Sequence, residues 1–227
     1  MSVSSSNPNL GLYIHWPFCQ KKCPYCDFNS HVSSDHDNEE FGSALCQEMS
    51  YMANLIPERR SLTSIFFGGG TPSLMPPDVI AKIISHAEKT FGFRTKVEVS
   101  IEANPTSFEA AAMKEFSNAG VNRVSMGLQS LDDNTLKFLG REHTVSEALS
   151  ALHLARQNFA NVSLDLIYAT INETPKSWQS QLMKVLGLDM PHLSLYQLVI
   201  ERGTAFYTRQ RNGEQLNLND DVAADLY

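Results

Sequence analysis

Short runs of apolar, strand-forming residues alternate with helical patterns along the chain, and this alternation limits the fold more than any other feature. The strand candidates cover residues 11–16, 64–67, 97–103, 123–129, 162–169 and 192–200. Apolar residues recur at helical spacing over residues 38–55, 77–90, 107–119, 145–158 and 175–186. From the second run on, strands start about 26 to 39 residues apart, the length of one strand–helix unit. The sequence therefore predicts an α/β fold with a parallel sheet, either open or curved into a partial barrel.

The composition fits one large globular domain. The 227 residues are 42% hydrophobic and 19% charged, which is enough apolar material for a buried core. We expect a flexible leader over residues 1–9 and one core domain over residues 10–227. The final stretch, NDDVAADLY, has the pattern of a helix that is beginning, so we expect a longer parent chain with a C-terminal domain missing here.

Charge and hydropathy restrict the partners and the compartment. The chain carries 18 basic and 25 acidic residues, a net charge of -7, with no basic run, so we expect no nucleic-acid partner. No apolar stretch approaches the roughly 18 residues of a membrane span, so we expect no transmembrane segment. The leader lacks the features of an export signal. These features predict a reducing cytoplasm, where clustered cysteines are more often metal ligands than disulfides.

Three cysteines lie within eight positions directly after the first strand candidate. Cys19, Cys23 and Cys26 have the spacing C-x3-C-x2-C. Three thiolates from one loop can hold three corners of a 4Fe-4S cluster and leave the fourth iron without a protein ligand. The open iron would then be a binding site for a small molecule.

A structural zinc site is the alternative use of these thiols. It would need a fourth ligand, and His15, His31 and Cys46 are available, although structural zinc usually combines two short Cys or His clips rather than one triple loop. Cys46 shares an apolar helical pattern with Leu45 and Met49, which is typical of a buried core thiol.

The cysteine spacing, together with the aromatic Tyr25 between the last two cysteines, resembles the signature of the radical S-adenosylmethionine (SAM) superfamily. The resemblance implies a partial (β/α)6 barrel of the TIM type. It also implies that the amino and carboxylate groups of SAM bind the open iron, and that electron transfer from the cluster cleaves SAM to a 5′-deoxyadenosyl radical.

Polar groups follow the next strand candidates, where parallel sheets place their functional residues. The glycine-rich loop over residues 66–73 lets backbone approach a ligand closely, and we expect its amides to pair with the amino acid part of SAM. Glu102 and Gln129 end the third and fourth strand candidates, and their side chains suit amines or ribose hydroxyls. Each of these features alone also suits an ordinary turn or a solvated strand end.

Asp165 interrupts an apolar strand, and an unpaired buried carboxylate is costly, so a partner is expected. Arg141 is a candidate either for that pairing or for the SAM carboxylate. Tyr13 and His15 share one face of the first strand by the two-residue period, and Tyr13 would approach the cluster or SAM unless it only packs in the core.

Several motifs together resemble the coproporphyrinogen dehydrogenase group of the superfamily, and most of all its HemW-type heme chaperones. They are LYIHWPFCQKKCPYCDF, FFGGGTPS, SIEANP, RVSMGLQS, LGREHT and LDLIYA. The resemblance implies that Cys19, Cys23 and Cys26 bind the cluster. It implies SAM contacts from nine residues: Tyr13, Tyr25, Gly69, Gly70, Thr71, Glu102, Gln129, Arg141 and Asp165.

Two departures from that group bear on function. The dehydrogenases carry a further cysteine two positions after the motif, where this chain has Phe28, and the usual Gly-Leu-Pro after Asp-Leu-Ile-Tyr is replaced by the stretch ATINET. We therefore expect a heme chaperone that receives electrons from a donor and passes heme to acceptor proteins, with no catalytic residue assigned. Oxygen-independent coproporphyrinogen III dehydrogenase, an enzyme of porphyrin biosynthesis, and a zinc-stabilised binding module are the alternatives.

Overall fold

The computed structural model describes residues 9–56 and 60–227, so the predicted leader lies outside it except for Asn9. All six predicted strands form, with ends that differ from the sequence prediction by a few residues. They are β1 (Leu10–Trp16), β4 (Leu62–Gly69), β5 (Phe93–Ala103), β6 (Arg123–Gln129), β7 (Asn161–Tyr168) and β8 (His192–Gln197). Two short strands, β2 (Phe18–Cys19) and β3 (His31–Val32), pair with each other and bracket the cysteine loop.

The six long strands form one sheet in the order β1-β4-β5-β6-β7-β8, and every neighbouring pair is parallel. Strand order follows chain order, so each crossover moves one strand further along the sheet, as in a TIM-type barrel. β1 and β8 are the two ends of the strand order, which leaves the barrel open between them. The predicted α/β fold with a partial barrel is confirmed.

The helices that cross between strands match the sequence pattern closely. They are α1 (Asn38–Leu55), α2 (Pro77–Phe91), α3 (Ser107–Ala111), α4 (Met113–Asn118), α6 (Val145–Asn158) and α7 (Pro175–Leu186). The single helix predicted over residues 107–119 is wrong. Ala112 divides it, because its N–H bonds to the carbonyls of Glu109 and Ala110 in a tightened turn.

Four short helical segments were not predicted from periodicity: η1 (Pro72–Leu74), α5 (Asp133–Phe138), α8 (Ala205–Arg211) and, apart from its opening pattern, α9 (Asp220–Leu226). Side-chain caps begin three of them, with Asp132, Thr204 and Asn219 accepting from helix N–H groups. Among the described residues, no helix is long and apolar enough to cross a membrane.

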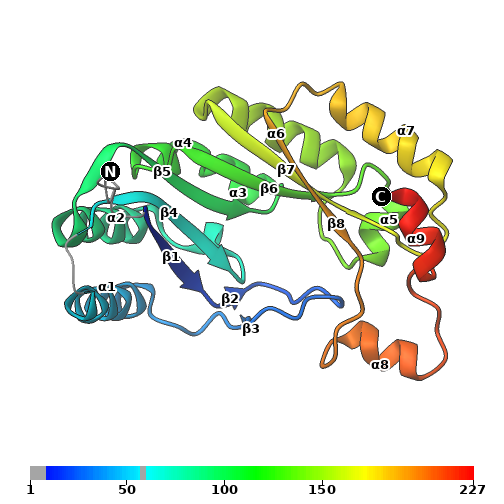
Figure 1. Cartoon of the computed structure of the whole chain (residues 1–227), viewed down its shortest axis with the longest axis horizontal. Coiled ribbons are helices and arrows are strands. Elements are labelled where there is room, and N and C mark those ends of the chain that lie inside the picture. The colour runs from blue at the N-terminus through cyan, green and yellow to red at the C-terminus, as the bar shows by residue number, and fades with distance from the viewer. Residues whose placement is uncertain (1–8, 57–59) are drawn as a thin grey trace, which may run out of the picture.

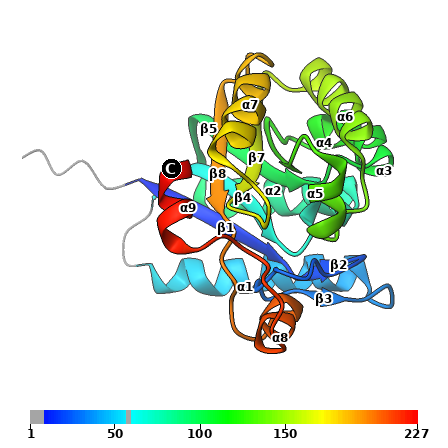
Figure 2. The same ribbon diagram turned by 90° about the vertical axis from the view of Figure 1, so that its right-hand side faces the viewer.

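The strands are apolar on the face that carries the helices and mostly polar on the other face. Along β6, Val124, Met126 and Leu128 are fully buried in the main core, while Ser125 and Gln129 point to the opposite side. α2 contacts β4, and α6 contacts β6 and β7. Figures 1 and 2 show the β2–β3 segment and α8 together below the strands, apart from α6 and α7. The polar face is therefore available for a site.

The departure after Asp165-Leu-Ile-Tyr has a structural consequence. Ala169 takes the place of the usual glycine and adopts φ of 62°, the left-handed region that strains a residue with a Cβ. The loop pairs with the segment near residue 217, since Thr170 bridges Asn217 and the Ile171 N–H donates to the Leu216 carbonyl at 3.3 Å. None of residues 169–174 lines the main cavity described below.

Candidate functional site

The carboxyl ends of the parallel strands surround a cavity of about 370 Å³. This volume lies in the range of small-molecule sites, about 300 to 1,000 Å³. Eleven of the twelve site residues predicted from the sequence line it: Cys19, Cys23, Tyr25, Cys26, Gly69, Gly70, Thr71, Glu102, Gln129, Arg141 and Asp165. The fold thus brings together groups that lie up to 146 positions apart in the chain.

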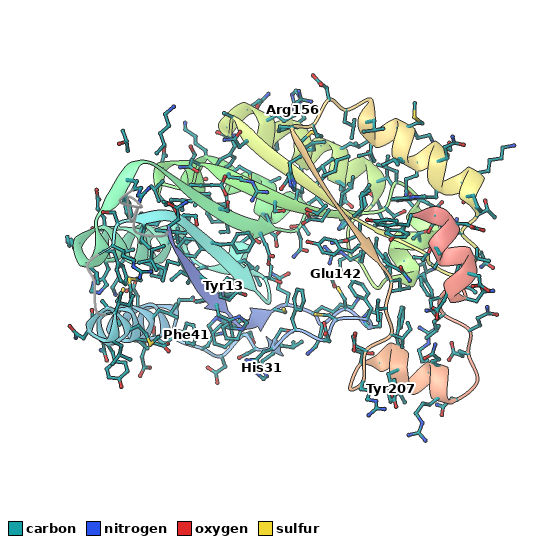
Figure 3. The ribbon with its side chains drawn as sticks, viewed as in Figure 1. Tyr13, His31, Phe41, Glu142, Arg156 and Tyr207 are labelled. Carbon is teal, nitrogen blue, oxygen red and sulfur yellow. The ribbon has the colours of Figure 1, made fainter. Side chains whose placement is uncertain are left out.

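Hydrogen bonds from both flanks fix the cysteine loop. The His31 N–H donates to the Pro17 carbonyl at 2.7 Å, which closes the loop at its base. His15 Nε2 lies 2.9 Å from the Asn29 carbonyl, and Lys22 Nζ donates to the Phe28 carbonyl at 3.1 Å. Lys21 Nζ is 3.7 Å from a carboxylate oxygen of Glu142, which Figure 3 shows beside the cysteine segment. The three thiols are therefore presented by an ordered loop.

α8 supports the same loop from below. The Phe206 N–H donates to the Pro24 carbonyl at 2.8 Å, and the Phe206 ring lies 6.4 Å from the Tyr25 ring. Phe206 is fully buried in a second, smaller core. Its other members are Leu139, Ile167, Leu198 and Leu216, with Tyr25, Phe138 and Ile200 packed against them. Sequence reasoning missed this support because nothing in a seven-residue helix indicates which loop it contacts.

The glycine-rich loop over residues 66–73 forms hydrogen bonds with the backbone at the start of the cysteine loop. The N–H groups of Gly70 and Thr71 donate to the carbonyls of Trp16 and Phe18, at 2.7 and 2.9 Å. The prediction that the loop's amides pair with SAM is therefore wrong for these two groups. The loop still needs glycine, because a Cβ on Gly70 would lie 2.9 Å from Cys19 Sγ. Gly69 has φ of 118°, which disfavours any other residue.

The cysteine side chains suit an iron–sulfur cluster. All four cysteines are free, and Cys46 is buried in the main core on α1, as the sequence predicts. Burial raises the pKa of the Cys26 thiol, while the Phe28 N–H, Ser30 and Lys22 act in the opposite direction. Arg141 Nη1 donates to Cys23 Sγ at 3.5 Å, so a cationic group lies beside this sulfur.

The fourth ligands considered for zinc do not join the three thiols. His15 bonds to the Asn29 carbonyl, His31 lies exposed on β3, and Cys46 lies in the main core. Across residues 9–56 and 60–227, no three His, Cys, Asp or Glu side chains converge on a point that could hold a single metal ion. Three thiolates of a cubane cluster bind three different irons, so a cluster does not require such convergence.

Arg141 and Asp165 do not form the pair that the sequence suggested as one possibility. The Ser125 hydroxyl lies 3.1 Å from both Asp165 carboxylate oxygens. Arg141 Nη2 donates instead to Asn104 Oδ1 and, at 3.1 Å, to the Gly127 carbonyl. The positive charge of Arg141 is thus directed at the cysteine loop, and Asp165 remains within the cavity wall.

Two carboxylates in the cavity influence each other. Burial raises the pKa of Glu102 to about 7, and the charge of Asp165 adds to the shift. Burial also raises the pKa of Asp165, while hydrogen bonds from the Ser194 and Ser125 side chains lower it by less. With its pKa at about 7, Glu102 is partly protonated near neutral pH, which reduces the repulsion between the two carboxylates. These acceptors are suited to amine or hydroxyl donors of a ligand.

Gln129 has an unused acceptor in the cavity wall. Its side-chain Oε1 is buried and has no hydrogen-bond partner in the described part of the chain. Its φ of 64° is uncommon for a residue with a Cβ. An unpaired buried polar atom and a strained backbone are both typical of a ligand-binding position.

Tyr13 is the one predicted contact that does not line the cavity. Its ring stacks on Phe66 at 6.1 Å, and its hydroxyl hydrogen-bonds His15 Nδ1 at 3.2 Å. Figure 3 shows it on β1, and its side chain is 56% exposed. Burial, and after it the charge of Glu102 in the cavity wall, raises the pKa of Tyr13, which lies at the margin of the site and not in the cavity wall.

Sequence reasoning missed other residues of the cavity wall. Asn104 and Ser125 lie inside motifs that were recognised, and Ser125 shares the face of Gly127 and Gln129 by the two-residue period of β6. That period could have revealed Ser125. The segment from Tyr196 to Val199 also lines the cavity, but its apolar sequence resembles any buried strand.

Comparison with known proteins gives the same result as the motifs. The model of the radical SAM superfamily matches residues 13–180. The chain is 39% identical over 226 residues to radical S-adenosyl methionine domain-containing protein 1, mitochondrial, of Danio rerio, covering 99% of this chain and 51% of the relative. It is 41% identical over 207 residues to the heme chaperone HemW of Haemophilus influenzae, covering 89% and 54%.

Among solved structures, the chain resembles the coproporphyrinogen III oxidase HemN of Escherichia coli, a radical SAM enzyme. The TM-score is 0.81 at 28% identity, over 96% of this chain and 50% of the other. The chain thus spans about half the length of the relatives that it matches. Its family match, covering most of the chain, and the cavity that gathers the cysteine motif lead to one conclusion: the chain belongs to the radical SAM superfamily.

Proposed function

We propose that Cys19, Cys23 and Cys26 hold a 4Fe-4S cluster in this chain, and that SAM binds in the adjoining cavity. The family implies both cofactors. The observation that carries the proposal is the cavity itself, whose wall holds three free thiols, two half-buried carboxylates and a Gln129 Oε1 that has no partner among the described residues. When bound and reduced, the cluster supplies the electron that cleaves SAM.

The roles proposed for the other residues follow from their chemistry. Glu102 and Asp165 accept from amine or hydroxyl groups, and Gln129 uses its free Oε1. The Arg141 guanidinium donates to Cys23 Sγ and stabilises the negative charge of this sulfur when it binds the cluster. Tyr25 contributes an apolar ring against the second core. Gly69, Gly70 and Thr71 form part of the wall of the main cavity. Tyr13 contacts SAM from the margin of that cavity.

We further propose that the protein binds heme and delivers it to acceptor proteins. This rests on the HemW relative, whose name describes a heme chaperone, and on Phe28. Phe28 lines the cavity, is 56% exposed, and stands where the resemblance gives dehydrogenases a cysteine. Residues 10–227 would form the radical SAM core. A reducing compartment suits four free cysteines, and the cytoplasmic location stays a prediction because several relatives are named mitochondrial.

Oxygen-independent coproporphyrinogen III oxidation is the second candidate, favoured by the backbone similarity to HemN. It would oxidise propionate side chains of the porphyrinogen and release carbon dioxide, with SAM as the oxidant. The absence of a thiol at Phe28 argues against it. Neither candidate follows from the fold alone, because one fold supports many activities.

A heme titration separates the two candidates. With the cluster reconstituted without oxygen, added heme is expected to give a Soret band that saturates at about one heme per chain, because a specific site saturates. No decarboxylated porphyrinogen is expected when the cluster-loaded chain is incubated with coproporphyrinogen III, SAM and dithionite. Catalytic formation of that product would overturn the chaperone proposal, and failure of the Soret band to saturate would remove heme binding from this chain while the cluster remains.

A further inference from the structure

A second, smaller cavity of about 50 Å³ adjoins the main one. The two share Lys21, Cys23, Thr71, Asn104 and Arg141 in their walls. The smaller cavity adds a buried acidic residue, Glu109 on α3, that the proposed function does not use.

A chain of hydrogen bonds runs from this carboxyl to the cysteine loop. Arg141 Nη1 donates to Cys23 Sγ at 3.5 Å, and its Nη2 donates to Asn104 Oδ1. Asn104 Nδ2 donates in turn to Glu109 Oε1 at 3.3 Å. Because an arginine only donates, Asn104 must turn its oxygen to Arg141 and its amide nitrogen to Glu109. An acceptor at position 109 therefore fixes the orientation of Asn104, and through it the place of Arg141.

The surroundings of Glu109 make its charge sensitive to pH. The side chain is 3% exposed, and Oε2 has no hydrogen-bond partner among the described residues. Burial raises the pKa of Glu109 to about 7, while Asn104, Ser73 and Arg141 favour its ionised form. The carboxyl therefore gains and loses its proton near neutral pH.

We propose that Glu109 is a positioning residue for the cluster ligand Cys23, and that proton uptake at its carboxyl is coupled to electron uptake at the cysteine loop through Asn104 and Arg141. The inference rests on the proposed cluster. The electron comes from a one-electron reductant, dithionite in the experiment below, and the proton comes from solvent; no covalent bond other than O–H forms.

The sign of the coupling follows from the charges. When Glu109 is ionised, it partly offsets the positive charge that Arg141 presents to Cys23. When Glu109 is protonated, the positive charge acts in full and favours an added electron. The reduction potential of the cluster is therefore expected to be higher at low pH and to fall as pH rises through about 7.

Other titratable groups near Glu109 are few. His143 is buried, and burial and Arg141 lower its pKa to about 4, so it stays neutral through this pH range. Lys21 and Glu142 face each other at 3.7 Å on the wall of the small cavity. The charged and titratable residues of neighbouring α4 and α6 are exposed: Lys114, Glu115, Glu147, His153 and Arg156. Glu102 of β5 titrates in the same range, with its pKa raised to about 7.

The test is a redox titration of the cluster-loaded chain with dithionite, followed by electron paramagnetic resonance between about pH 6 and pH 8.5, a range that brackets the pKa of Glu109. In the wild type, the equilibrium constant for reduction is expected to fall about three- to tenfold across the range, or about 30 to 60 mV for one electron.

Glu109→Gln keeps an acceptor for Asn104, so we expect it to keep the wild-type iron content. It should lose the part of the pH dependence of the reduction potential that comes from the Glu109 carboxyl. Glu115→Gln, an exposed residue of α4, is the matched control and should retain the wild-type profile. Glu102→Gln measures how much of the pH dependence of the reduction potential comes from the Glu102 carboxyl.

The cluster-free chain gives a separate measurement on Glu109. The folded-state pKa of Glu109 lies above the unfolded value of 4.5. The contribution of its protonated carboxyl to the free energy of unfolding is therefore complete below about pH 4.5 and is lost as pH rises through about 7. Urea unfolding should therefore show a smaller loss of stability over this window in Glu109→Gln than in Glu115→Gln. Equal losses in the two variants would overturn the inference.

The outcomes distinguish the inference from the proposed function. A loaded wild type whose potential does not change with pH, or a Glu109→Gln variant with the wild-type profile, overturns the coupling and leaves the cluster assignment intact. A wild-type chain that takes up neither iron nor sulfide would overturn both the coupling and the cluster assignment.

Discussion

Cys23→Ser is expected to abolish cluster binding. Three thiolates are the whole protein ligand set of the proposed cluster, so removing one leaves two, and the Arg141 guanidinium loses the sulfur to which it donates at 3.5 Å. The iron content after reconstitution should fall from about four per chain to near zero, with loss of the broad thiolate–iron absorbance near roughly 400 nm.

Cys46→Ser is the matched control for this loss. Cys46 lies in the main core on α1 and takes no part in the cavity wall. The serine hydroxyl can bond to a carbonyl one turn back in the helix, so the cost should be about 1 kcal/mol in unfolding free energy, with full cluster content. A Cys23→Ser protein that keeps all its iron would contradict the cluster assignment.

Gly70→Ala is expected to reduce cluster occupancy by about tenfold or more while the chain stays folded. The new Cβ would lie 2.8 Å from the Phe18 carbonyl oxygen, 2.9 Å from Cys19 Sγ and 3.0 Å from the Pro17 carbonyl carbon. Two of these atoms are backbone, so the cysteine loop itself must move. Overpacking of this kind costs about 1 to 3 kcal/mol, and each 1.4 kcal/mol corresponds to tenfold in binding.

Gly187→Ala serves as the control for the glycine change. Gly187 ends α7 with an ordinary φ of -66°, and the nearest atom to its added Cβ is the Lys184 carbonyl oxygen at 3.3 Å. Iron and sulfide analysis should give wild-type values for Gly187→Ala, and circular dichroism should confirm that both variants fold. Wild-type iron content in Gly70→Ala would show that the tight contact with the cysteine loop has no importance for the cluster.

Periodicity predicted the regular elements well because their signals are local. The bounds of β6, α1, α6 and α7 match the sequence pattern residue for residue. A proline begins α7, and β6 is a short run of strand-forming residues whose interior is buried throughout, so each element carries its own evidence. The parallel order of the strands also follows from their spacing. The partial barrel itself came from the family resemblance.

The contacts that assemble the site are not local, and sequence reasoning handled them less well. Asp165 was expected to need a partner, but its Ser125 neighbour lies 40 positions away on another strand. The Gly70 N–H was expected to face a ligand, yet it donates to Trp16, 54 positions earlier. The support of Pro24 by Phe206 joins segments 182 positions apart. Pairings of this kind depend on how the strands align, which the composition of each strand does not determine.

The central claim is that the cysteine loop leaves one iron open and that SAM completes its coordination. Mössbauer spectroscopy of the chain reconstituted with ⁵⁷Fe tests it most directly, because each iron of a 4Fe-4S cluster contributes to the spectrum. Adding SAM should change the signal of about one quarter of the iron, the site without a thiolate, and leave the rest unchanged. A spectrum that SAM does not alter, from protein that binds SAM, would contradict the claim.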